Sequence, residues 1–426
     1  MSNDPELERL AKAARPGYIT DYSDFQPGQH QVLYSGPYWD HREITAILTN
    51  VLHGDWIVSG DNVVEFQQAF AKRFAVAHSH MVNSGSSANL VMITALRKHF
   101  NWRDNDEIIV SPVGFPTTIA PIMQNNLRPV FADIEMQTLN FDLDQVERII
   151  SPRTKAIFVS PVLGNPPDMD RLQDICQRHH LVLIGDNCDS LGTQWRDQHI
   201  AELYFAWSCS FYPAHHICTG EGGMVSSNDS DFINTARSIS WWGRDCYCVG
   251  RNNTLSCGTC GTRFSKWLQD YDGVIDHKYL YSNVGYNLKP LDLQGAVGLI
   301  QLEKFDEIHA RRINHKQQVE QMLVDHIGIK SPITLPLAAP SWFGTPVICD
   351  SVDQKHLLVS HFESNRIQTR NYFGGNILLH PAYRHLADHR DFPNANSSLD
   401  LVFFLGCSPS WTKPVLTYIH DVITSW

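Results

Sequence analysis

Short apolar runs alternate with helical stretches between residues 60 and 240, and this alternation limits the possible folds more than any other feature of the sequence. The runs with strand character are Glu107–Ser111, Val130–Phe131, Ala156–Ser160 and Leu181–Ile184. The stretches with helical character are Val63–Phe74, Asn89–Phe100, Leu143–Ile150 and Leu172–His179. Strands that are apolar throughout are typical of strands buried on both faces of a sheet. The alternation therefore predicts an α/β fold in which helical crossovers connect the strands.

The length of the chain predicts a large domain and a smaller one. Its 426 residues are too many for one small core. Residues 241–285 interrupt the alternation with glycine, asparagine, cysteine and aromatic residues, and so long a loop is uncommon unless it has a function. Helical spacing returns over Leu291–Ala310. We predict a large domain over residues 1–310, including the excursion at 241–285, and a small C-terminal α+β domain over residues 311–426.

Charge and hydropathy exclude two classes of partner. The formal net charge is -11, from 34 Lys+Arg against 45 Asp+Glu, and no basic run occurs, so we expect no nucleic-acid partner. The N-terminus is polar rather than a signal peptide, and apolar runs such as Leu401–Leu405 are far shorter than the ~20 residues of a membrane span. We therefore expect a cytoplasmic protein without a membrane partner. In that reducing compartment, clustered cysteines are more often metal-binding or catalytic than disulfide-bonded.

Two short segments have the chemistry of a cofactor site. Residues 83–88 read N-S-G-S-S-A and precede a helix, so Gly85 and Ser86 would leave backbone N–H groups free to bind a phosphate. The alternative is an ordinary serine-capped helix. Asp186 ends a buried strand, at the edge where open α/β sheets bind ligands, and its carboxylate can hold the protonated ring nitrogen of a pyridoxal-type cofactor. The alternative for Asp186 is a turn or N-cap aspartate.

Residues 207–223 carry a family resemblance. They read W-S-C-S-F-Y-P-A-H-H-I-C-T-G-E-G-G. This resembles the S-F-x-P-x-K and G-E/D-G-G pattern around the Schiff-base lysine of the DegT/DnrJ/EryC1/StrS sugar aminotransferases, and N-S-G-S-S-A-N, G-F-P-T-T and G-Y-N-L-K fall in family order. The resemblance implies a type I pyridoxal-phosphate transferase fold, like that of aspartate aminotransferase. His215 occupies the lysine position, and no lysine occurs from residue 156 to residue 265.

The same resemblance implies roles for further residues. Phe115 matches the aromatic residue that stacks on the cofactor ring; its alternative is a core phenylalanine. Ser210 matches a phosphate ligand. Asn287 matches an asparagine that reaches the phosphate from the partner subunit, so we expect a homodimer. Tyr212 lies close to His215 in the sequence and is predicted to be catalytic with it.

The cysteine spacing is similar to that of the iron–sulfur sugar 3-dehydratases within this family, which also share D-N-C-D-S-L-G, W-G-R-D-C-Y-C and C-G-T-R-F. Those enzymes hold a [2Fe–2S] cluster on cysteines spaced C-x57-C-x-C-x7-C. Cys188, Cys246 and Cys248 reproduce the first two spacings. The fourth ligand departs from the pattern, since eleven residues separate Cys248 from Cys260 and eight separate it from Cys257. The C-G-T-R-F flank favours Cys260, with Cys257 as the alternative.

The implied activity is C-3 deoxygenation of a nucleotide-linked 4-keto-6-deoxyhexose. Without a lysine, the cofactor would act as pyridoxamine phosphate (PMP), with His215 as the base. A flavin or iron–sulfur NAD(P)H-dependent reductase would supply electrons through the cluster, because the chain has no dinucleotide-binding G-x-G-x-x-G between a strand and a helix. Two alternatives stay open: a cluster-free, glutamate-dependent sugar dehydratase, and a degenerate aminotransferase-fold binding protein with structural zinc.

Overall fold

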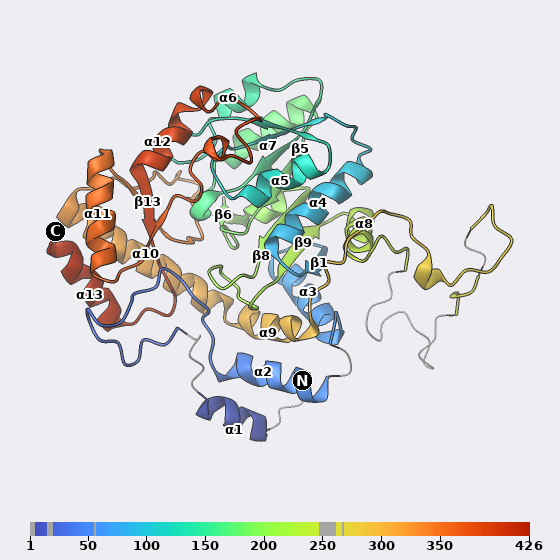
Figure 1. Ribbon diagram of the computed structural model, residues 1–426, viewed down its shortest axis with the longest axis horizontal. Helices are drawn as coiled ribbons and strands as arrows, with labels where there is room; N and C mark the ends of the chain where they lie inside the picture. The colour runs from blue at the N-terminus through green and yellow to red at the C-terminus, as the bar shows by residue number, and fades with distance from the viewer. Residues whose placement is uncertain (1–4, 15–19, 55–56, 247–260, 266–267) are drawn as a thin grey trace.

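The computed structural model describes residues 5–14, 20–54, 57–246, 261–265 and 268–426 (Figure 1). Its centre is a seven-stranded sheet in the order β1-β9-β8-β5-β4-β2-β3. The strands are β1 (His78–Val82), β2 (Glu107–Val110), β3 (Arg128–Phe131), β4 (Thr154–Val159), β5 (Val182–Asp186), β8 (Ala206–Ser210) and β9 (Gly223–Ser227). Strands β8, β5, β4, β2 and β3 are parallel, and β9 is antiparallel to both of its neighbours. The predicted α/β fold is confirmed.

Helices cover both faces of this sheet (Figure 1). They are α3 (Asp61–Arg73), α4 (Gly85–His99), α5 (Pro116–Gln124), α6 (Leu143–Arg148), α7 (Met169–His179) and α8 (Ser230–Ser240). Successive strand residues point to opposite faces. Ile108 and Phe158 pack in a core with α4, α5 and α8, whereas Ile109 and Ile157 pack in a second core with α3, α6 and α7. This two-sided burial explains why the strands are apolar without alternation.

The predicted helix over residues 291–310 is wrong in its extent. Two helices, α9 (Asp292–Glu303) and α10 (Phe305–Ile327), meet at Lys304. Helix α10 continues past residue 310 because buried residues recur at helical spacing along it, as at Ile308, Arg312 and His315. The boundary predicted at residue 310 therefore falls within one continuous helix, and the division into two domains stays a prediction.

A second, smaller sheet lies in the C-terminal part of the chain. Its antiparallel strands β11 (Thr345–Ile348), β13 (Val402–Leu405) and β12 (Thr369–Asn371) pair in that order. The helices there are α11 (Val352–Ser364), α12 (Pro393–Leu401) and α13 (Lys413–Thr424). Short strands β6 (Gln194–Trp195), β7 (Gln198–His199) and β10 (Ala338–Ala339) form a third sheet. No helix in the described ranges is long and apolar enough to cross a membrane.

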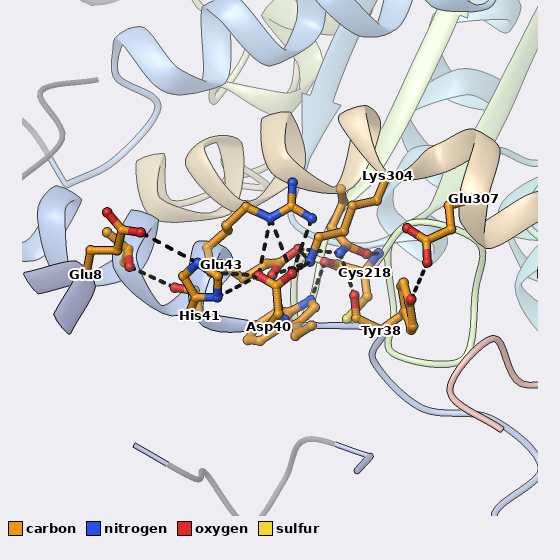
Figure 2. A network of polar contacts seen from close by, with 12 residues as sticks. Glu8, Tyr38, Asp40, His41, Glu43, Cys218, Lys304 and Glu307 are labelled. Carbon is orange, nitrogen blue, oxygen red and sulfur yellow. Dashed lines mark hydrogen bonds and ion pairs between the residues drawn. The ribbon is translucent and has the colours of Figure 1, made fainter. Parts of the chain in front are cut away.

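A buried polar network joins helix α2 (His41–His53) to the junction of α9 and α10, and a more exposed pair, Glu8 and His41, extends it to α1 (Pro5–Ala13) (Figure 2). The Lys304 Nζ atom lies 2.7 Å from the fully buried Glu43 carboxylate. Gln301 donates to the same carboxylate and accepts a hydrogen bond from the amide of Cys218. Removing one partner of a buried ion pair is strongly destabilising. The network therefore fixes both α2 and the loop that follows His215.

Candidate active site

The carboxylate of Asp186 is fixed by three donors at the end of β5. Its Oδ2 atom accepts hydrogen bonds from Asn89 Nδ2 at 2.8 Å and from Thr118 Oγ1 at 2.7 Å. Its Oδ1 atom accepts from the amide of Cys188 at 3.2 Å. Asp186 itself is buried at the sheet edge where open α/β folds bind ligands. A carboxylate held this way can stabilise the protonated ring nitrogen of a pyridoxal-type cofactor.

The first turn of helix α4, at Gly85 and Ser86, lies beside Ser210 at the end of β8, and we call these three residues the cradle. The Ser84 side chain caps the helix by accepting from the amide of Ser87, which leaves other first-turn N–H groups free. A Cβ atom added to Gly85 would lie 2.4 Å from the Cβ of Ser210, so only glycine lets these segments approach this closely. The structure thus brings the predicted phosphate residues Gly85, Ser86 and Ser210 to one place. Free amides at a helix N-terminus suit a phosphate group.

Gly85→Ala is expected to weaken binding of pyridoxamine phosphate. The added methyl group would push α4 away from Ser210, and overpacking of this kind costs about 1–3 kcal/mol. That cost corresponds to roughly 5- to 150-fold in Kd, measured by titrating the cofactor absorbance. Alanine favours a helix, so the far-UV circular dichroism should stay unchanged. Unaltered affinity would show that the phosphate does not bind at α4.

His215 follows β8, with its ring largely enclosed beside the ring of Phe343 at a centroid distance of 5.2 Å. Its Nδ1 atom lies 3.6 Å from Asp189 Oδ1 and has no hydrogen-bond partner among the described residues. Burial and the nearby Arg312 charge lower the pKa of His215 to about 3. Burial and the charge of Asp186 raise the pKa of Asp189 to about 8. Both shifts favour the neutral forms of these two side chains.

The aromatic residues predicted for the site are accessible to a ligand. Tyr212 is 48% exposed, and its ring lies edge-on to His215 at 6.4 Å. Phe115 is 54% exposed and precedes α5 as its N-cap residue, which excludes the alternative of a core phenylalanine. Asn287 is also exposed, and its neighbour Leu288 accepts a hydrogen bond from the amide of Asn83. A partner subunit's use of Asn287 stays a prediction.

The predicted cluster ligands are only partly described. Cys188 and Cys246 are each partly accessible, and burial raises the pKa of the Cys188 thiol well above its ordinary value. Cys248, Cys260 and the alternative Cys257 lie outside the described residues. Within the described ranges, no three histidine, cysteine or carboxylate side chains gather as a metal site. The iron–sulfur prediction is therefore untested by the structure. Five other cysteines are buried: Cys176, Cys209, Cys218, Cys349 and Cys407.

Several site residues were missed by reasoning from the sequence. Asn89 and Thr118 lie in the N-S-G-S-S-A-N and G-F-P-T-T segments, whose family resemblance could have identified them. Phe343 and Arg312 come from distant segments without any motif. Gly185 is fixed by close packing, because an added Cβ would lie 2.3 Å from the Tyr204 ring.

The fold, the cradle at helix α4 and His215 together describe a class of protein. Comparison with known sequences shows which family this is. Residues 39–424 match the DegT/DnrJ/EryC1/StrS aminotransferase family model, so the chain belongs to that family. It is 36% identical over 411 residues to dTDP-4-dehydro-2,6-dideoxy-D-glucose 3-dehydratase of Saccharopolyspora spinosa, covering 94% of this chain and 88% of the relative.

Solved structures of a second 3-dehydratase have the same fold. The E. coli GDP-4-keto-6-deoxy-D-mannose-3-dehydratase with bound hydrated pyridoxal phosphate (PLP) superposes with a TM-score of 0.78 at 26% identity, covering 92% of this chain and 100% of that chain. A histidine-to-asparagine mutant of GDP-4-keto-6-deoxymannose-3-dehydratase with bound GDP-perosamine gives a TM-score of 0.80 at 27% identity, with the same coverage. The predicted type I transferase fold is confirmed.

Proposed function

We propose that this protein is a PMP-dependent 3-dehydratase acting on a nucleotide-linked 4-keto-6-deoxyhexose. The observation that carries the proposal is His215, an imidazole at the position where the family keeps its Schiff-base lysine. Imidazole cannot hold the cofactor as a stable Schiff base, yet it can accept a proton. The names of the relatives support the substrate class, since they are 3-dehydratases of nucleotide-linked deoxysugars.

The residues of the site fit the cofactor. The amides of α4 and the Ser210 hydroxyl would hold its phosphate, Asp186 would keep the ring nitrogen protonated, and the exposed Phe115 ring would cover one face. When bound, PMP supplies an amine that condenses with the sugar ketone and a ring that withdraws electrons. His215 would accept the proton whose removal allows the hydroxyl at sugar C3 to leave as water. Tyr212, edge-on to His215, would contact the substrate from the open side.

The finer proposal adds a [2Fe–2S] cluster on Cys188, Cys246, Cys248 and Cys260. Its support is the cysteine spacing, in particular the 57 residues between Cys188 and Cys246. Such a cluster carries one electron at a time. A separate flavin or iron–sulfur NAD(P)H-dependent reductase would supply the two electrons that convert the dehydrated sugar to the 3-deoxy product. Under the same proposal, the exposed Asn287 acts across a homodimer interface.

A reaction assay distinguishes this proposal from its rivals. Anaerobically purified protein with PMP and dTDP-4-dehydro-2,6-dideoxy-D-glucose should exchange solvent ¹⁸O into the C3 hydroxyl of the sugar without a reductase, because dehydration is reversible. Release of 3-deoxy product should require a reductase and NAD(P)H. Product formation with glutamate and no reductase would favour the cluster-free dehydratase. Transfer of an amino group to the sugar would instead show an aminotransferase, and stoichiometric zinc without turnover would favour a binding protein.

A further inference from the structure

The Arg312 guanidinium lies buried behind the loop that carries His215. It is 1% exposed and comes from the middle of helix α10. Its Nη2 atom donates to the backbone carbonyl oxygens of Ala214 at 2.9 Å and of His215 at 3.0 Å. Two of its acceptors are thus backbone carbonyl oxygens, one from the proposed base and one from the residue before it.

The same guanidinium reaches two further parts of the chain. Its Nη2 atom also donates to Ser35 Oγ at 3.3 Å, and the Ser35 hydroxyl in turn donates to the Ala214 carbonyl at 2.9 Å. Its Nη1 atom donates to the Phe343 carbonyl at 3.2 Å. Phe343 also packs its ring against His215. Arg312 therefore joins the histidine loop to the N-terminal segment and to the segment that encloses the imidazole.

These contacts are unusual for a buried cation. Within the described residues, no carboxylate lies within ion-pair distance of Arg312, and its Nε atom has no hydrogen-bond partner. A buried charge without a paired counter-charge is costly. Its acceptors are all neutral: three backbone carbonyl oxygens, the Ser35 hydroxyl and the Cys407 thiol. A rigid, planar fork with several donors suits such a dispersed set of acceptors. A residue needed merely to fill this space would be apolar.

We propose that Arg312 is the positioning residue of His215, holding the histidine loop in register with Phe343 and Ser35. The inference rests on the proposed role of His215 as the base. Arg312 touches the backbone of the histidine rather than the substrate, so it acts through His215.

Arg312→Lys tests this proposal in the PMP-loaded enzyme. Lysine keeps the charge but donates from a single point, so it cannot span the Ala214, His215 and Phe343 carbonyls. Misplacement of a base by about 1 Å can cost about 10²-fold in rate. We expect kcat per cofactor-loaded chain to fall by roughly that factor while KM for the nucleotide sugar stays near the wild-type value. Amide hydrogen exchange should rise in a peptide covering residues 212–219.

Arg311→Lys is the matched control. Arg311 is the adjacent residue of α10, but it is more exposed, donates to the Pro409 carbonyl and faces Glu307. Its variant should keep wild-type kcat and wild-type exchange in the 212–219 peptide. If Arg312→Lys fails to fold, Ser35→Ala decides the question, because it removes one support of the same loop and should raise exchange there.

Two outcomes would overturn the proposal. One is wild-type kcat in folded Arg312→Lys, which would show that charge alone suffices. The other is unchanged exchange in the 212–219 peptide of Arg312→Lys, or of Ser35→Ala where the lysine variant does not fold. Failure of the proposed function looks different, because His215→Asn would then stay active. An inactive His215→Asn beside a fully active Arg312→Lys would refute the positioning role alone.

Discussion

His215→Asn is expected to lower the rate of dehydration by roughly 10²–10⁴-fold, the usual cost of removing a general base. Asparagine is close in size to histidine but cannot accept a proton at neutral pH. The cradle at Gly85 and the carboxylate of Asp186 are held by other residues, so cofactor binding should be unchanged. The measurements are ¹⁸O exchange into the C3 hydroxyl of the sugar and the Kd for PMP.

Two companion variants make this result specific. His361→Asn makes the same change at a histidine whose Nε2 atom bonds to the Val422 carbonyl in the C-terminal part, and it should keep full activity. His215→Lys restores the family's lysine and should let borohydride trap pyridoxal phosphate on the protein, which wild type should not allow. Near wild-type dehydration by His215→Asn would move the base to Tyr212 or to the buried His216.

The sequence pattern predicted strands best where both faces of the strand are buried. The strands at Glu107, Ala156 and Leu181 were predicted within a few residues, because strands covered by helices on both faces are apolar throughout. Strand β8 was not predicted, since A-W-S-C-S contains two serines. Ser208 can be buried there because its hydroxyl donates to Asn89, which holds Asp186. That pairing depends on α4 lying beside β8, and no local pattern reveals it.

The residues of the candidate site also fall into two groups, those that a sequence motif marks and those that only packing reveals. Motif-bearing residues such as Gly85, Asp186 and His215 could be identified from the sequence, since their chemistry depends on neighbours in the chain. Arg312 could not, because it lies about a hundred residues after His215 in a helix rich in charged residues, where an arginine normally faces solvent. Its burial follows from the packing of α10 behind the histidine loop. Sequence reasoning thus predicted the reacting groups and missed the residue that we propose positions one of them.

Cys188→Ser is expected to abolish the cluster while leaving dehydration in place. Wild-type protein purified anaerobically should contain about two irons and two sulfides per chain, and the variant almost none. The amide of residue 188, which supports Asp186, is kept in the variant, so the cofactor site should stay intact. Cys176→Ser, at a buried thiol in α7, is the matched control and should keep its iron.

The variant also separates the two halves of the proposed reaction. Dehydration needs the cofactor site alone, so Cys188→Ser should still exchange ¹⁸O into the C3 hydroxyl of the sugar, yet release no 3-deoxy product with reductase and NAD(P)H. Cys260→Ser should behave in the same way and Cys257→Ser should not; the reverse would make Cys257 the fourth ligand. Full iron content in Cys188→Ser would refute the ligand assignment. Deoxygenation by an iron-free variant would show that electrons reach the sugar without a cluster, and the glutamate-dependent dehydratase would then be the better description.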